Sequence, residues 1–127
     1  MKLEERTVTG HQMHNVLVHP VGEPGVLGRI LGEPLTSRVA LPLAMLAKIL
    51  QLELAKVEKS AGEIVVAASK DGKVETDKVP SVKAEIEELY AAPRKVQLPN
   101  VRITAPEFTV SAADILMLEG LVSFEEA

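Results

Sequence analysis

The most constraining feature of this sequence is a long run of apolar residues at helical spacing between residues 42 and 69. Its apolar positions recur in steps of three and four, which places them on one face of an α-helix. They are Leu43, Leu46, Leu50, Leu54, Val57, Ala61, Ile64 and Ala68. Pro42 suits the first turn of such a helix better than its interior. The pattern therefore predicts one long central helix over residues 42–69.

The C-terminal end of this run is compatible with two structures. Gly62 weakens a helix by about 1 kcal/mol relative to alanine. The β-branched residues of "EIVVA" also suit a strand that begins near residue 63. Asp71-Gly72 predicts a turn in either case. Residues 63–75 are therefore the end of the helix or a hairpin, and the sequence leaves both open.

Capping signals predict a short helix near the N-terminus. Thr9 and Gln12 fit a capping box, and Val8 with Met13 forms the matching hydrophobic staple. Further along, "GVLGRIL" lies between two Gly-Glu-Pro repeats and has room for one or two helical turns, ended by Gly32. Both helices are expected to be short.

Similar signals predict two helices in the C-terminal half. Ser81 can cap a helix over residues 82–92, which we expect to pack antiparallel against the central helix. Ser111 and Asp114 fit the opening of a last short helix, and Gly120 fits its C-terminal end. The tail "SFEEA" is acidic and is expected to be frayed.

These patterns predict a mainly α fold, with an α+β fold as the alternative. We expect residues 1–127 to form a single domain. Its parts would be an extended arm at 1–8, short helices and turns at 9–41, a helical hairpin at 42–92, and an extended segment, short helix and acidic tail at 93–127. A minor β element could join residues 2–8 to the 95–110 region, which Pro99 and Pro106 break into short extended pieces.

Composition excludes several classes of protein. The net charge is −4 and no dense basic run occurs, so nucleic acid is an unfavourable partner. The chain has no cysteine, which excludes disulfides and thiolate metal sites. The longest apolar stretch, 39–50, is too short to span a bilayer and contains Pro42 and Lys48. The first residues lack the apolar run of a secretory signal, so we expect an intracellular protein away from the membrane.

Candidate chemical groups are few. All three histidines, His11, His14 and His19, lie in "HQMHNVLVH", where the first two share one helical face. A metal site would need a further ligand and supporting hydrogen bonds, so we interpret them as half-exposed polar residues. Lys48 would be reactive if buried, but more often such a lysine keeps its amine in water. No Gly-x-Ser-x-Gly motif occurs. We therefore expect no enzyme, no metal and no cofactor.

The first half of the central helix carries more apolar residues than one buried face needs. Between residues 41 and 54 its polar side chains are Lys48, Gln51 and Glu53 alone. A surface helix should show one apolar stripe, so other helices cover this one or another protein chain contacts it. A second copy of the chain is one candidate. The predicted contact residues are Leu43, Met45, Ile49, Leu52 and Leu54. The alternative is that all five lie in the core.

The order of several motifs resembles that of a family of small uncharacterised proteins of tailed bacteriophages. The resemblance covers most of residues 9–122. It lies in "GHQMHNVL", "EPLTSRVALPLAMLAKILQLELAKVEK", "SKDGKV", "VKAEIEELY", "VQLPNV" and "SAADILMLEGLV". It implies a phage origin and a non-catalytic role, and it carries no active residues across.

Two functions follow as hypotheses. The first is a phage protein that acts by protein–protein contact in virion structure or assembly, as a tail or neck accessory, in the host cytoplasm or within the virion. The second is a soluble inhibitor of a host enzyme such as RNA polymerase or a defence nuclease. A contiguous acidic stripe would favour the inhibitor. Its residues would be Glu85, Glu87, Glu88, Glu125 and Glu126.

Overall fold

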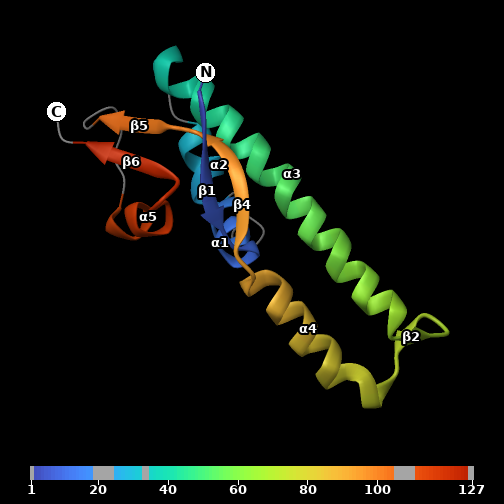
Figure 1. The fold of residues 1–127 in the computed structure, drawn as a ribbon. Helices are drawn as coiled ribbons and strands as arrows, with labels where there is room; N and C mark the ends of the chain where they lie inside the picture. Colours follow the sequence, from blue (N-terminus) through green and yellow to red (C-terminus); the bar gives the residue numbers. More distant parts are fainter. Residues whose placement is uncertain (1, 19–24, 33–34, 105–110, 126–127) are drawn as a thin grey trace.

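The structure is a computed structural model that describes residues 2–18, 25–32, 35–104 and 111–125. It is mainly α-helical with small β elements, as predicted (Figure 1). In chain order the elements are β1 (Leu3–Val8), α1 (Gly10–Leu17), α2 (Val26–Leu31), α3 (Ser37–Ala67), β2 (Ser69–Lys70), β3 (Lys73–Val74), the 3₁₀ turn η1 (Thr76–Lys78), α4 (Val79–Ala91), β4 (Arg94–Pro99), β5 (Val101–Thr104), α5 (Ala112–Met117) and β6 (Val122–Glu125).

The long helix α3 begins at Ser37, so the predicted start at Pro42 is wrong. Pro42 lies inside the helix, where its ring nitrogen has no hydrogen to donate to the carbonyl of Arg38. The additional turn buries Val39, which lies one helical turn before Leu43 on the core-facing side. Burial of this apolar side chain stabilises the turn and offsets the missing hydrogen bond.

The helical alternative is correct for residues 63–67, so a strand that begins near residue 63 is wrong. The helix continues to Ala67, and the short hairpin of β2 and β3 follows it. The φ angles of Asp71 and Gly72 are 54° and 80°. A tight hairpin turn of type I′ needs positive φ at both central residues, which Asp-Gly readily adopts.

Helix α4 begins at Val79 rather than at 82, so Ser81 lies in its first turn and is not the cap. Pro80 near the N-terminus of the helix explains the earlier start, because proline is tolerated in the first turn. From the hairpin the chain turns back, and α4 lies beside the C-terminal half of α3 (Figure 1). Val82 is the buried residue of α4.

Two small sheets hold the ends of the described chain. β1 pairs antiparallel with β4, from Leu3 opposite Pro99 to Val8 opposite Arg94, which confirms the predicted β element. β5 pairs with β6 in parallel. The expected frayed tail is therefore wrong for residues 123–125, which lie in β6. Val122 is buried and Phe124 packs against the core, so the strand is held by alternate apolar side chains.

The predicted caps are confirmed in part. The Thr9 hydroxyl accepts a hydrogen bond from the Gln12 backbone at 3.1 Å, but the Gln12 side chain does not complete a capping box and instead donates to the Glu119 carbonyl. The box of Ser111 and Asp114 is complete, because each side chain accepts from the other's backbone N–H. Gly120 has a φ of 80°, but the C-cap of α5 is Leu118, so Gly120 lies in the turn after the helix and its predicted place at the helix end is wrong.

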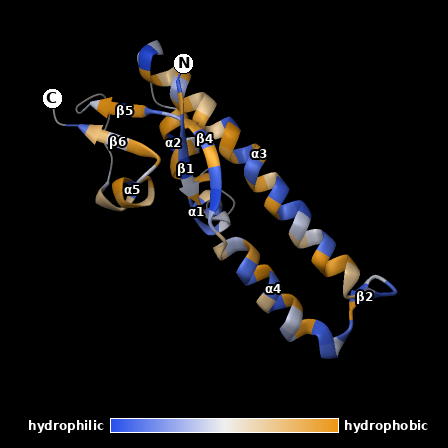
Figure 2. Cartoon of the chain, in the orientation of Figure 1, coloured by the Kyte–Doolittle hydropathy of each residue, from blue (hydrophilic) through white to orange (hydrophobic). Residues whose placement is uncertain are grey.

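The core lies where α1, α2 and the first two-thirds of α3 meet β4, β5 and β6. Hydrophobic residues concentrate in α2 and the adjoining part of α3 (Figure 2). Val57 is the last α3 residue in this core, and the distal parts of α3 and α4 project beyond it (Figure 1). In the part of the chain that the structure describes, no helix is long and apolar enough to cross a membrane.

Candidate protein-contact surface

The outward face of α3 carries an exposed stripe at contact spacing, here called the α3 seam. Its members follow one another in steps of four and three. They are Leu41, Met45, Lys48, Leu52, Ala55 and Lys59. The exposed fractions of Leu41, Met45 and Leu52 are 65%, 41% and 59%. Alternating steps of three and four are the spacing by which one helix packs along another, so the α3 seam is a surface suited to a further helix.

The structure divides the five predicted contact residues between the core and the α3 seam. Leu43 and Leu54 are buried, and Ile49 is half-buried against the core. These three are covered by the chain itself. Met45 and Leu52 lie on the α3 seam. The most exposed member, Leu41, was missed because the helix was expected to begin only at Pro42.

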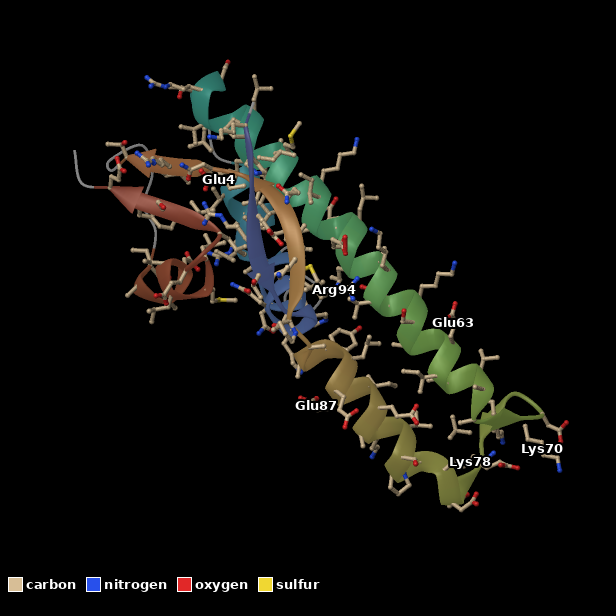
Figure 3. The ribbon with its side chains drawn as sticks, in the orientation of Figure 1. Glu4, Glu63, Lys70, Lys78, Glu87 and Arg94 are labelled. Atoms are coloured by element: carbon tan, nitrogen blue, oxygen red, sulfur yellow. The ribbon has the colours of Figure 1, made fainter. Side chains whose placement is uncertain are left out.

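A charged cluster on the other side of α3 holds the helix against the start of β4. Glu53 accepts hydrogen bonds from Lys56 at 3.0 Å and from Arg94 at 3.2 Å. Burial acts to raise the pKa of Glu53, but the hydrogen bonds from Lys56 and Arg94 outweigh it and lower the pKa below its ordinary value. Figure 3 shows Arg94 between β4 and α3. The Arg94 side chain therefore helps to hold α3 in the orientation in which the α3 seam faces away from β4.

His11 and His14, the two histidines in the described part of the chain, do not belong to a metal-ligand cluster. His11 lies 2.8 Å from the Glu87 carboxylate of α4 (Nε2 to Oε1), and its ring centroid is 5.6 Å from that of Tyr90 (Figure 3 labels Glu87). His14 is exposed, and His19 lies outside the described residues. Within those residues no group of three or more histidine, aspartate or glutamate side chains could hold a metal ion. His11 thus serves as a link between α1 and α4.

Polar side chains from the N-terminal third bind the segment 111–125. Arg29 of α2 donates to both carboxylate oxygens of Asp114, at 2.6 and 3.4 Å. Arg6 of β1 donates to the Gly120 carbonyl at 2.8 Å, and the Gln12 side chain to the Glu119 carbonyl at 3.2 Å. Together these side chains dock α5 and β6 onto the rest of the fold.

Asp114 is the buried charged residue of the described chain. Burial acts to raise the pKa of Asp114, but the hydrogen bonds from the Arg29 guanidinium and from Ser111 outweigh it and hold the pKa below its ordinary value. At neutral pH the ionised Asp114 carboxylate is therefore paired with the Arg29 guanidinium. Sequence reasoning found its capping role but missed its partner, which lies 85 residues away.

Two of the hollows on the described surface lie beside α3. An open groove of about 630 Å³ runs between the distal parts of α3 and α4, over Ile64 and Val82 and between Glu63 and Lys78 (both labelled in Figure 3). The other, of about 640 Å³, lies beside the start of α3 and contains Arg38 and Arg102. Neither lining, as far as the described residues show, contains a histidine.

Comparisons with protein families, with curated protein sequences and with solved structures find no match for this chain.

Proposed function

We propose that this protein is a non-catalytic component of a tailed bacteriophage that acts by protein–protein contact in virion structure or assembly. The observation that carries the proposal is the exposed α3 seam. Single exposed apolar side chains are common on protein surfaces. Three large ones in twelve residues of one helix, at helix-packing intervals, indicate a contact surface instead.

In this proposal α3 and α4 act as an antiparallel helical pair that presents the contact surface. The α3 seam lies on the side of α3 that faces away from the core, so a partner can approach it without displacing the rest of the fold. The phage part of the proposal rests on the order of sequence motifs. Under this proposal the protein is found in the host cytoplasm and, after assembly, in the virion.

Inhibition of a host enzyme ranks second, because the acidic residues that would support it are divided. Glu85, Glu87 and Glu88 lie on α4, whereas Glu125 lies on β6 at the other end of the molecule (Figure 1). Glu126 lies outside the described residues. Mimicry of a nucleic acid needs a contiguous acidic surface, and the three glutamates of α4 do not form one with Glu125.

The test is capture of partners from infected cells by a tagged chain at native levels. We expect virion proteins at stoichiometric yield with the wild-type chain and a loss of that yield with Leu52→Glu, because a charge on the α3 seam must be desolvated in the contact. Leu116→Glu is the matched control. Leu116 is 69% exposed and lies on α5, away from the α3 seam. Enrichment of a host enzyme without virion proteins, or equal capture by Leu52→Glu, would contradict the proposal.

A further inference from the structure

The outward face of α4 has a pattern that matches the α3 seam. Exposed residues recur along it and along η1 in steps of four and three. They are Asp77, Ser81, Ala84, Glu88 and Ala91, here called the α4 face. The α4 face carries small side chains and carboxylates, whereas the α3 seam carries large apolar side chains and lysines. The two surfaces are therefore complementary in side-chain size and in charge.

We propose that the α4 face of a second copy of this chain covers the α3 seam, with the two helices antiparallel. This inference names the partner of the surface on which the proposed function rests. Read in opposite directions, the two surfaces have identical spacing. The facing pairs are Met45 with Ala91, Lys48 with Glu88, Leu52 with Ala84, Ala55 with Ser81, and Lys59 with Asp77.

In this alignment each large side chain faces a small one, and each lysine faces a carboxylate. Met45 and Leu52 face alanines, so the helices can approach closely while the large side chains fill the space between them. Lys48 and Lys59 face carboxylates. In the described part of the chain, none of Lys48, Lys59, Asp77 and Glu88 forms an ion pair. Over these five pairs each surface spans fifteen residues, from Met45 to Lys59 and from Asp77 to Ala91, or roughly 21 Å along the helix.

Other arrangements fit less well. A parallel alignment with Lys48 opposite Asp77 and Lys59 opposite Glu88 has the same spacing, but it sets Met45 opposite Val74 of β3, beyond the α4 face, so Met45 stays uncovered. Two α3 seams packed together would bring the lysines of both copies into one contact that contains no carboxylate, and like charges in a contact are unfavourable. Charge complementarity therefore favours the α4 face as the occupant.

The contact is expected to be head-to-tail. Within one chain, α4 faces the groove beside α3 with Val82, on the side opposite to Ala84 and Glu88, and Ser81 lies at the edge of the α4 face that lines this groove. The α3 seam and the α4 face are thus free at the same time, and each copy can bind one neighbour through each. Such a heterologous contact closes into a ring or continues as a filament.

The test is sedimentation velocity of the full chain over a wide concentration range. We expect the wild type to associate beyond a dimer, and Lys48→Glu and Glu88→Lys each to weaken association by about tenfold or more. The double variant Lys48→Glu/Glu88→Lys should restore it, because the pair is opposite in charge again. Lys70→Glu, at the exposed hairpin, is the control and should change nothing. Circular dichroism checks that each variant is folded.

A wild-type chain that stays monomeric overturns this inference, as does Glu88→Lys without effect or a double variant that does not recover. If self-association fails in this way but the wild type still captures virion proteins and Leu52→Glu does not, the proposed function stands and only the partner assigned here is wrong. If instead the charge swap restores self-association and no virion protein is captured, the inference stands and the virion role fails.

Discussion

The pair of Arg29 and Asp114 should contribute measurably to stability, and Asp114→Ala is the substitution that tests it. The change removes half of a capping box, which costs about 1 kcal/mol, and a charged hydrogen bond, which costs about 1.5–3 kcal/mol. The Arg29 side chain is 56% exposed, so solvent screening places the ion pair at or below the low end of that range. We therefore expect the free energy of unfolding to fall by about 2 kcal/mol.

The contribution of Asp114 should depend on pH in a defined direction. Its pKa is lowered in the folded protein, so folding favours the ionised form. The stabilisation is fully present above the ordinary pKa of 3.8 and is lost as the pH falls through the folded pKa. The difference between wild type and Asp114→Ala should therefore shrink below about pH 4.

Urea unfolding followed by circular dichroism measures both effects, at pH 7 and at about pH 3. Glu85→Ala, which removes an exposed carboxylate from α4, is the control and should change stability by less than about 0.5 kcal/mol. Arg29→Ala completes a double-mutant cycle that isolates the pair. A loss below about 0.5 kcal/mol for Asp114→Ala, or an equal loss at both pH values, would refute the reasoning.

Two further predictions concern packing. Leu50→Ala leaves a cavity at a fully buried position of α3 and should lower the free energy of unfolding by about 3 kcal/mol in the same urea assay; a value below about 1 kcal/mol would show a poorly packed core. Gly10→Ala places a Cβ 3.0 Å from the Tyr90 ring and should destabilise by about 1 kcal/mol or more. Gly62→Ala meets nothing within 4 Å and should stabilise by up to about 1 kcal/mol, so equal signs for the two glycines would contradict the structure.

The helices were predictable because their signals are local. The Thr9 hydroxyl and the Ser111–Asp114 box act within one turn, and the face of α3 repeats every three or four residues. The start of α3 was not predictable from local signals, because it depends on burial of Val39 by elements distant in sequence. The parallel pairing of β5 with β6 was missed for the same reason, since a four-residue strand has no local signal that names its partner.

The contact surface was predictable only as an excess of apolar residues. The sequence shows that α3 has more leucines than one face can bury, but not which of them are covered. That depends on where α1, α2 and β5 lie around the helix. Leu43 and Leu54 face those elements, whereas Leu52 faces away. The α4 face was overlooked, because alanine and glutamate on a helix usually indicate nothing more than a solvated side.

The pairing of β1 with β4 has a consequence for the order in which the chain acquires its structure. Leu3 lies opposite Pro99, and Arg6 binds the carbonyl of Gly120. During synthesis the first strand therefore has no partner until some ninety further residues have been made, whereas the turns of α3 form from neighbours already present. Until then the backbone N–H and C=O groups of β1 have no strand to pair with, whereas α1 can already pack against α2 and α3.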